Sequence, residues 1–405
     1  MLVKIIDYDH QGRGIAKIDN KIIFIPKVKL GEEVSIKLVK EKKNYSIGKR
    51  YDLLKVKYCP YYQTCGGCQI GHLTYDEQLE FKKNTVKNIF SKYTNYNLDS
   101  LEIIPTKCYN YRNKVTFHIK GDKLGYYEEE TNNLIHIDKC NLLDSNIITL
   151  TASLNSFIKV HKKLTKAIIK SLDGRLMLIL EGKEDKESIN KFFSSNVSSL
   201  YYNNELISGV PSLMIDVLSK KFMVRKDSFF QVNKEGISLI YKEVINLVKE
   251  LNCNIIYDLY CGTGTISLLV SDYAKKVIGI EVVEDAVRDA KSNAKLNNIT
   301  NTEFYLGDAS KVIKRLDYTP DTIILDPPRS GISKDLIDFL LSLKVKNIIY
   351  VSCNPLTLAR DINLLDSIYH LESIKLVDEF PNTYHLESIS LLNLRKKKIN
   401  SILYK

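Results

Sequence analysis

The sequence has no apolar run of membrane-spanning length, and its first residues, MLVKIIDYDH, lack the pattern of a secretory signal peptide. We therefore expect a cytoplasmic protein that does not enter a membrane. Its eight cysteines should then stay reduced, so clustered cysteines favour metal binding or catalysis over disulfides. A chain of 405 residues is long enough for two or three domains, each with its own core.

A further absence concerns a glycine. The segment NIIYDLYCGTGT resembles a buried strand that ends in a glycine-rich turn, which is how many nucleotide-binding sites begin. The third glycine of the dinucleotide-binding pattern is missing, because Ser267 occupies its place. This argues against a nicotinamide or flavin cofactor. Gly262, in the turn, remains a candidate cofactor-binding residue.

Two carboxylates end the strands that follow. The run Lys276–Ile280 leads to Glu281, which is placed to accept hydrogen bonds from both hydroxyls of a ribose. Asp308 comes after the run Glu303–Leu306 and is placed to reach the edge of an adenine. The alternative interpretation is that both are surface carboxylates at strand ends.

Two short β-branched runs, Thr322–Leu325 and Asn347–Val351, are typical of strands buried in a parallel sheet. They end in DPPR and SCNP, so Asp326 and Cys353 should lie on the rim where such sheets bind ligands. Pro355 suits the first turn of a helix, whose dipole would favour the Cys353 thiolate; the alternative is a buried structural thiol. An adenosine without a pyrophosphate, an Asp-Pro-Pro loop and a nearby nucleophile together indicate S-adenosylmethionine as the cofactor.

The net charge of +11 is concentrated at the two ends of the chain. Residues 1–58 carry a net charge of +7, and residues 395–405 contain five Lys or Arg and no acid. This segregation favours RNA as a partner, although a general preference for lysine is an alternative. Residues 1–54 alternate apolar and polar positions in short pieces, which predicts a small closed antiparallel barrel. The pattern DHQGRGIAKIDNKIIFIP resembles the TRAM domain, an RNA-binding barrel.

Three cysteines gather at Cys59, Cys65 and Cys68, with two glycines between the last pair. Glycines let backbone amides approach the sulfurs closely, which suits a cluster. Cys140 is the best candidate for a fourth ligand and Cys108 the competing one. Four thiolates suit an iron–sulfur cluster or zinc; zinc sites usually pair two short cysteine hairpins, so we favour the cluster over zinc or metal-free thiols.

The sequence as a whole predicts an α/β protein of three domains, acting as a monomer. These are a TRAM-like β-barrel at 1–56, a mixed α+β iron–sulfur domain at 57–224, and a Rossmann-like class I methyltransferase domain at 225–405. A capping box at Thr74–Glu77 predicts the start of a helix in the middle region.

Five motifs, SFFQVN, DLYCGTG, LDPPR, SCNP and FPNTYHLES, occur in an order that resembles the RNA (uracil-5-)-methyltransferase family. The barrel and the CPxxxxCGGC pattern resemble its iron–sulfur branch, which modifies 23S ribosomal RNA. The resemblance implies Cys353 as nucleophile and Glu387 as general base. It implies cofactor binding by Gln231, Tyr260, Glu281 and Asp326, and a [4Fe-4S] cluster held by Cys59, Cys65, Cys68 and Cys140.

The chemistry of uracil is consistent with these roles. Carbon 5 is a poor nucleophile until a thiolate adds to carbon 6, and a base must later remove the carbon-5 proton. We expect Glu387 to be that base, with His385 as the rival. RNA cytosine-5 methyltransferases typically carry a Pro-Cys in the loop that reads Asp-Pro-Pro-Arg here, so the absence of a cysteine from this loop favours uracil. The alternatives are a tRNA substrate and an iron–sulfur RNA-binding protein without catalysis.

Overall fold

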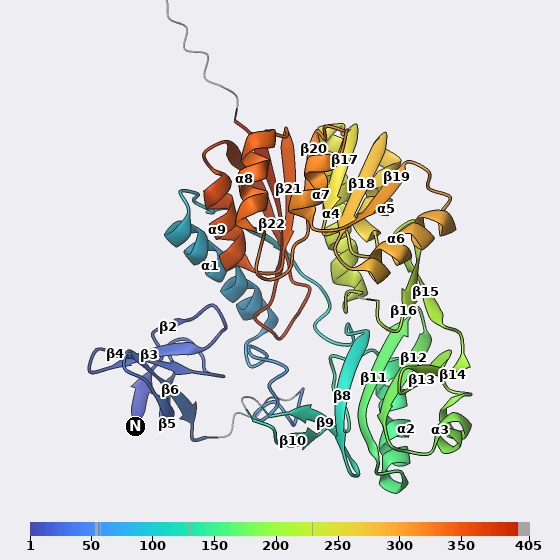
Figure 1. The fold of residues 1–405 in the computed structure, drawn as a ribbon. Helices are drawn as coiled ribbons and strands as arrows, with labels where there is room; N and C mark the ends of the chain where they lie inside the picture. Colours follow the sequence, from blue (N-terminus) through green and yellow to red (C-terminus); the bar gives the residue numbers. More distant parts are fainter. Residues whose placement is uncertain (53–55, 57, 129–130, 229, 396–405) are drawn as a thin grey trace, which may run out of the picture.

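The computed structural model describes residues 1–52, 56, 58–128, 131–228 and 230–395 (Figure 1). The segment 396–405, which holds most of the basic tail, lies outside the described residues. The strands of the described part of the chain form three sheets and a two-stranded hairpin. No helix within it is both long enough and apolar enough to cross a bilayer.

The N-terminal β domain has six strands in the order β1-β5-β6-β4-β3-β2. Alternate side chains turn inward around a core that includes Ile5, Ile25 and Ile36. The predicted antiparallel arrangement is wrong at one pair: β4 and β6 run parallel, because the chain crosses over through β5 before β6 joins β4. The strands are β1 (Leu2–Lys4), β2 (Asp7–Tyr8), β3 (Gly14–Ile18), β4 (Lys21–Ile25), β5 (Glu33–Glu41) and β6 (Tyr45–Arg50).

A second sheet of seven strands, in the order β10-β9-β8-β11-β12-β13-β14, forms the middle of the molecule. Two helices, α2 (Ser145–Val160) and α3 (Lys186–Phe193), pack on it through Leu154, Phe157 and Phe193. This region has the mixed α+β character that the sequence predicts. The strands are β8 (Lys114–Lys120), β9 (Lys123–Tyr127), β10 (Leu134–His136), β11 (Leu164–Leu172), β12 (Arg175–Gly182), β13 (Ser199–Tyr202) and β14 (Glu205–Gly209).

A hairpin of β15 (Ser212–Val217) and β16 (Lys220–Arg225) joins the middle region to the C-terminal sheet. The backbone N–H of Met223 donates to Asn293 Oδ1 at 2.9 Å, so the hairpin lies against the first helices of the C-terminal part.

The C-terminal sheet has eight strands in the order β19-β18-β17-β20-β21-β23-β22-β7. Strands β19 to β21 run parallel, and β23 is antiparallel to both of its neighbours. The strand order reverses between β17 and β20, because the chain first builds outward from β17 and then returns to its other side. The strands are β7 (Glu102–Ile104), β17 (Ile255–Leu259), β18 (Lys276–Glu281), β19 (Thr302–Leu306), β20 (Thr322–Leu325), β21 (Asn347–Ser352), β22 (Tyr369–Val377) and β23 (Glu387–Leu394).

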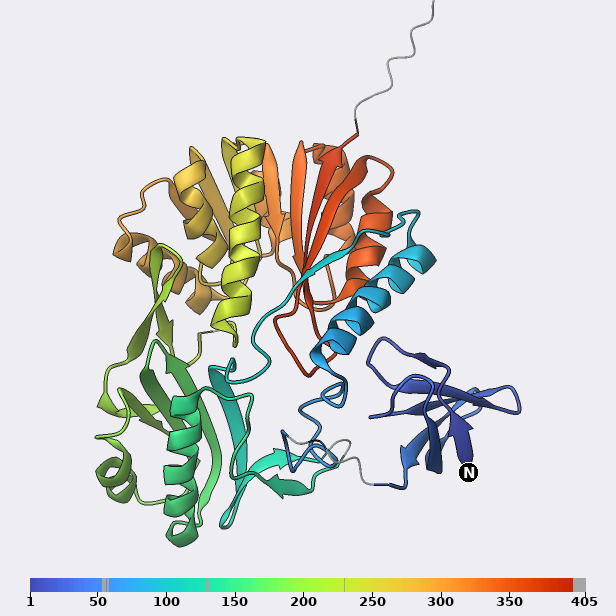
Figure 2. The same cartoon turned by 180° about the vertical axis from the view of Figure 1, so that it is seen from behind.

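Helices cover both faces of this sheet (Figures 1 and 2). On one face α4, α5 and α6 pack on Ile256 and Ile324, and on the other α7, α8 and α9 pack on Tyr257 and Ile323. Successive strand residues point to opposite faces, so one apolar run supplies both cores. The helices are α4 (Lys234–Leu251), α5 (Thr265–Val270), α6 (Glu284–Leu296), α7 (Ala309–Val312), α8 (Lys334–Leu343) and α9 (Pro355–Leu365), with short 3-10 turns at Ser271–Tyr273 and Ile313–Arg315.

Two elements from the interval 57–224 join the C-terminal sheet. Helix α1 (Tyr75–Tyr93) begins with the predicted capping box, in which Thr74 and Glu77 exchange hydrogen bonds. It packs beside α9, and β7 then pairs in parallel with β22 at the sheet edge (Figure 2). Lys82 of α1 forms a fully buried ion pair with Asp378, which follows β22. The segment before the middle sheet is therefore anchored on the C-terminal part.

Candidate active site

A cavity of about 1350 Å³ opens at the carboxyl ends of the parallel strands, where the strand order reverses. Open α/β sheets bind ligands at this place. The lining residues come from the loops after the C-terminal strands, from the segment 225–232 before α4, and from the hairpin and middle sheet. Of the predicted site residues, those that line the cavity are Gln231, Tyr260, Gly262, Glu281, Asp326, Cys353 and Glu387.

The glycine-rich turn forms one wall of the cavity. Tyr260 and Gly262 both adopt positive φ angles, of 69° and 54°. The backbone N–H groups of Tyr260 and Cys261 donate to the Ile280 carbonyl at 2.9 and 3.1 Å, which ties the turn to β18. A Cβ atom placed on Gly262 would meet nothing within 4 Å, so the turn faces open space on that side. A nucleoside can therefore approach the backbone here.

Glu281 lies at the end of β18, as the sequence predicts, and its carboxylate is held by backbone amides. Oε1 accepts hydrogen bonds from Val282 and Val283 at 2.8 and 2.9 Å, and Oε2 accepts one from Gly262 at 3.1 Å. A carboxylate has about four acceptor sites, so it can still bind a hydroxyl group in the cavity. The three amides fix its orientation before any ligand arrives.

Asp308 has a different environment. It is exposed, it is the N-cap of α7, and its Oδ1 accepts a hydrogen bond from the Ser310 N–H at 3.0 Å. It does not belong to the described lining of the cavity. It is nonetheless near, because its charge contributes, after burial, to raising the pKa of Tyr260 to about 12.

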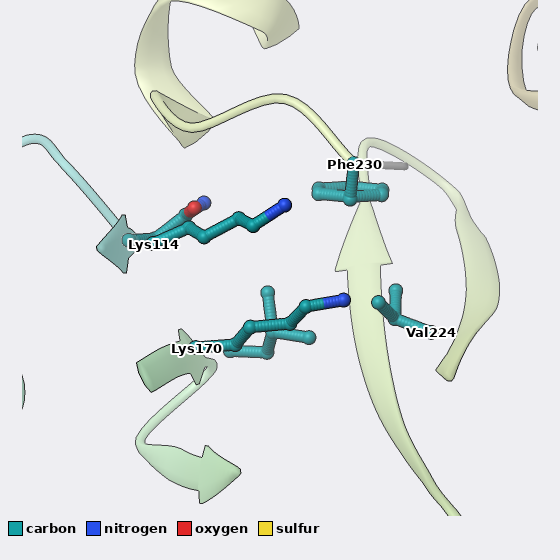
Figure 3. A pocket seen from close by; sticks show the side chains of 6 residues that line it. Lys114, Lys170, Val224 and Phe230 are labelled. Carbon is teal, nitrogen blue, oxygen red and sulfur yellow. The ribbon is translucent and has the colours of Figure 1, made fainter. Parts of the chain in front are cut away.

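Lys170 of β11 holds the segment that leads to Gln231. Its ammonium group donates to the carbonyls of Arg225, Lys226 and Ser228 at 2.9, 2.8 and 3.1 Å. Figure 3 shows Lys170 and Lys114, from neighbouring strands, reaching into one small gap beneath Phe230. Burial and then the charge of Lys114 lower the pKa of Lys170 to about 7.

Carboxyl groups gather at the floor of the cavity. Asp326 is half-buried and lines the cavity, and burial raises its pKa to about 7. Burial also raises the pKa of Asp258 to about 7, although Ser267 donates a hydrogen bond to it at 2.5 Å. Ser267 therefore has a role in the packing of α5 against β17. A cation bound in the cavity would relieve the cost of ionising Asp326.

Cys353 follows β21 and is half-buried at the cavity wall. We expect the helix dipole to favour the Cys353 thiolate, but the surroundings of this residue favour the neutral thiol. Burial raises the pKa of Cys353 to about 11, with further increases from Glu387 and Asp326 and a decrease from Arg329. The thiol stands before the N-cap residue Asn354, and burial, together with the charges of Glu387 and Asp326, favours its neutral form.

Glu387 begins β23 next to Cys353. Ser388 pairs with Ser352 in the antiparallel register, and its hydroxyl donates to the Ser352 carbonyl at 3.0 Å, so Glu387 and Cys353 lie at the same end of adjacent strands. Glu387 is 5% exposed. Burial, followed by the charges of Glu379 and Asp326, raises its pKa well above the ordinary value.

His385, the rival base, faces Arg329 instead. Both ring nitrogens lie 3.4 Å from Arg329 Nη2. Burial and the positive charge of Arg329 lower the pKa of His385 to about 4, which makes it a weaker base than Glu387. These pKa directions make Glu387 the stronger base of the two.

Sequence reasoning missed two cavity neighbours. Glu379 is fully buried close to Glu387, and it directly precedes the FPNTYHLES motif without belonging to it. Arg112 lines the cavity and also influences the pKa of Cys68 and of Cys140. It lies in YNYRNK, outside the sequence motifs described above, and its basic side chain is the one available signal.

The four predicted cluster cysteines come together in space. Burial and then the charges of Cys140, Cys65 and Cys59 raise the pKa of Cys68. The buried Lys27 ammonium donates to the Cys65 carbonyl at 3.3 Å, which joins this segment to the N-terminal domain. Within the described residues, however, no group of three or more His, Cys, Asp or Glu side chains is arranged to hold a metal ion. Cys108 lies apart, near Lys82 and Asp378.

Comparison with known proteins extends these observations. Residues 209–396 match the family model described as tRNA (Uracil-5-)-methyltransferase, and residues 1–50 match the TRAM domain. An uncharacterised RNA methyltransferase of Staphylococcus aureus is 32% identical, over 96% of this chain and 97% of that protein. Another from Clostridium acetobutylicum is 32% identical over 94% of each chain.

The solved structures include a match over nearly the whole chain. This is tRNA (uracil-54, C5)-methyltransferase of Pyrococcus abyssi in complex with S-adenosyl-L-homocysteine. It has a TM-score of 0.81 and 25% sequence identity, and the match covers 97% of this chain and 100% of that chain.

Fold, cavity and relatives define an S-adenosylmethionine-dependent RNA methyltransferase. The chain belongs to the RNA (uracil-5-)-methyltransferase family and carries a TRAM domain at its N-terminus. The family predicted from the five sequence motifs is confirmed, while the assignment to its iron–sulfur branch stays a prediction.

Proposed function

We propose that the protein methylates carbon 5 of a specific uridine in 23S ribosomal RNA, through a covalent bond between Cys353 and carbon 6 of the uracil. One observation carries the proposal. A thiol and a buried carboxyl group, Cys353 and Glu387, meet on adjacent strands at the wall of a cavity that also contains Asp326. Nucleophile and base are thus presented to the same ring.

In the first step the Cys353 thiol loses its proton to solvent, and the thiolate forms a bond to carbon 6. Because the pKa of Cys353 is raised to about 11, only a small fraction is thiolate at neutral pH. Arg329 lies near and favours the charged form. The electron pair displaced from the double bond makes carbon 5 a nucleophile.

S-adenosylmethionine, when bound, supplies an electrophilic methyl group to that carbon. We propose that Gln231, Tyr260, Gly262, Glu281 and Asp326 bind this cofactor, and that Asp308 contributes at the adenine end. The proposal is supported by their positions around the cavity and by the buried Asp326 carboxyl group, which a positive charge would compensate.

Glu387 then removes the proton from carbon 5. The electron pair of the C–H bond rebuilds the ring double bond, and the Cys353 sulfur leaves carbon 6 with its own electron pair. The raised pKa of Glu387 suits this step, because a carboxylate with high proton affinity is a stronger base. The target uracil must leave any RNA helix to reach the cavity.

The test is methyl transfer from labelled S-adenosylmethionine to unmodified rRNA. We expect labelled 5-methyluridine from the wild-type protein and none from Cys353→Ala. Cys253→Ala is the matched control, because Cys253 is a buried thiol that contacts Thr322 at the far end of the sheet. Unchanged methylation by Cys353→Ala would contradict the mechanism.

A transfer RNA is the second candidate substrate. The observation in its favour is the match over 97% of this chain to an enzyme described as acting on uracil 54 of tRNA. Offering unmodified tRNA and rRNA fragments in the same assay separates the two. The faster substrate at equal concentration decides between them.

We further propose that Cys59, Cys65, Cys68 and Cys140 hold a [4Fe-4S] cluster with a structural role. The proposal is supported by four half-buried cysteine thiols that lie near one another, because four thiolates are the usual ligands of such a cluster. Anaerobically purified protein should be brown and contain about four iron atoms per chain. A colourless, iron-free protein would contradict this assignment.

A further inference from the structure

Lys27 lies on the loop between β4 and β5 of the N-terminal domain, and two features set it apart. The residue is only 6% exposed, although lysine is rarely buried. Its φ angle is 61°, in the left-handed region that lysine seldom adopts. A strained backbone of this kind persists where the surrounding contacts fix it, so the contacts of Lys27 require an explanation.

The ammonium group of Lys27 binds a turn that lies outside the N-terminal domain. It donates hydrogen bonds to the carbonyls of Tyr62, Gln63 and Cys65 at 2.8, 3.2 and 3.3 Å. Within this turn the N–H of Cys65 donates to the Tyr61 carbonyl at 2.8 Å. The last carbonyls of a single helical turn have no donor within the turn, and a cation is well suited to satisfy them. The ammonium also lies 5.1 Å from the centre of the Tyr62 ring.

Further contacts surround this buried ammonium. His72, beyond the turn, has its Nε2 atom 2.9 Å from the Val28 carbonyl and its Nδ1 atom 2.7 Å from the Tyr62 hydroxyl. A Cβ atom on Gly12 would lie 2.3 Å from Ile70 Cγ2, so the chain fits closely against Ile70 at that point. The N-terminal domain is thus docked, through its β2–β3 and β4–β5 loops, on the cysteine-containing segment that precedes α1. Figures 1 and 2 show the domain beside the start of α1.

The segment on which the domain docks also contacts the catalytic sheet. The backbone N–H of Ile70 donates to the Asn382 carbonyl at 3.2 Å, in the loop between β22 and β23. Tyr8 of the N-terminal domain and Tyr384 of that loop pack against one small core. The core consists of Ile70, Leu73 and Phe81. A continuous series of contacts therefore links the N-terminal domain to the loop that leads into Glu387.

The docking leaves basic side chains of the domain exposed. Lys37 and Lys40 are exposed on β5, which is not part of either docking loop. Exposed lysines can contact the phosphates of RNA, whereas the buried Lys27 ammonium is occupied by carbonyls. The domain thus separates a docking surface from a charged one.

We propose that Lys27 is a positioning residue that docks the N-terminal domain in one fixed orientation, so that RNA bound by this domain enters the cavity in a set register with Cys353. The proposal rests on the proposed function, because it takes a uridine in RNA as the substrate. A fixed second binding site raises the effective concentration of the RNA at the cavity, and a loosely tethered one raises it much less. The distance between the N-terminal domain and the cavity thereby helps to select the uridine.

The test is Lys27→Met, assayed on RNAs that are truncated stepwise around the target uridine. The variant keeps the length of the side chain and removes its ammonium group. For long RNA, kcat/KM should fall about 5- to 20-fold. The loss should shrink as the RNA is shortened, to within about twofold of wild type for the shortest RNA that is still methylated. An equal loss at every length, or no loss on long RNA, would overturn the proposal.

The salt dependence of binding separates docking from direct contact with RNA. Because Lys27 is buried, its replacement should weaken the binding of long RNA without changing the slope of log Kd against log salt concentration. Lys37→Met, on the exposed side of β5, is the comparison variant and should reduce that slope by up to about one. If Lys27→Met reduces the slope as much as Lys37→Met does, Lys27 contacts phosphate and the docking role is wrong.

Two further measurements keep the test independent of one variant and of activity. Tyr62→Phe keeps the carbonyl that Lys27 binds but removes the hydroxyl at His72, so it should give the same length dependence with a loss of about 2- to 5-fold. In Lys27→Met the amides of residues 62–65 should exchange hydrogen about tenfold faster than in wild type. Unchanged exchange would contradict the docking contact. Failure of the wild-type protein to methylate any of these RNAs would instead overturn the proposed function, and hydrogen exchange would still test the docking contact.

Discussion

At the floor of the cavity and beside it, burial and then the charges of neighbouring carboxyl groups raise the pKa of three carboxyl groups: Asp326 acts on Asp258 and Glu379, and Glu379 and Asp326 act on Glu387. Proteins keep such groups neutral or balance them with a cation, because charge is costly in a site that excludes water. Here the reaction itself needs a strong base and attracts a cationic cofactor. The reaction therefore explains why the protein keeps these carboxyl groups together although they lower its stability.

Replacing Glu379 should stabilise the protein. The folded-state pKa of about 8 is raised above the ordinary 4.5, so the stability linked to this group is complete below about pH 4.5 and is lost as the pH rises through about 8. We expect Glu379→Met to raise the melting temperature by roughly 1–3 °C at pH 8 and to change it little at pH 5. Differential scanning calorimetry at both values checks this. A melting temperature lowered equally at both values would contradict it.

At the scale of the elements, the segment Arg225–Ser228 is held in place by a lysine from the middle sheet. Lys170 donates to three of its carbonyls, and the segment then supplies Gln231 to the cavity. We expect Lys170→Met to weaken binding of S-adenosyl-L-homocysteine about 5- to 20-fold, because three partly buried carbonyls lose their donor. Isothermal titration calorimetry measures this. The control is Lys166→Met on the same strand, whose partner is Glu181. Equal affinity in the two variants would contradict the role of Lys170.

Helix α1 is fixed to the loop before β23 by the Lys82–Asp378 pair, whose side chains are both fully buried. Removing one partner leaves a buried charge, so Lys82→Met should cost about 3–5 kcal/mol in the free energy of unfolding. The double variant Lys82→Met, Asp378→Leu should recover most of that loss. Urea unfolding of both variants checks the prediction. A double variant no more stable than the single one would refute a charge-based cause.

Sequence patterns predicted well those helices and strands that have a clear apolar run or a capping motif. The runs at 322–325 and 347–351 became β20 and β21, and the capping box at Thr74 starts α1. Such patterns did not predict which distant segments pair with each other. Nothing in Glu102–Ile104, for example, indicates that this strand joins β22. Likewise the pKa of Cys353 depends on Glu387 and Asp326, which only the fold brings near.

For the molecule as a whole, the N-terminal domain provides positive charge away from the catalytic cavity. Lys37, Lys40 and Lys42 are exposed on or just after β5. We expect the triple replacement by Gln to weaken RNA binding and to reduce the salt dependence of log Kd by up to about three. Filter binding at several salt concentrations measures this. An unchanged slope would show that these lysines do not contact phosphates.

The most direct test of the mechanism is covalent capture of RNA that contains 5-fluorouridine, followed by mass spectrometry of the digested complex. We predict an adduct on the peptide containing Cys353, with a capture rate that increases up to about tenfold per pH unit between pH 7 and 9, because the pKa of the thiol lies near 11. No adduct, or an adduct on another cysteine, would contradict the assignment of Cys353 as the nucleophile.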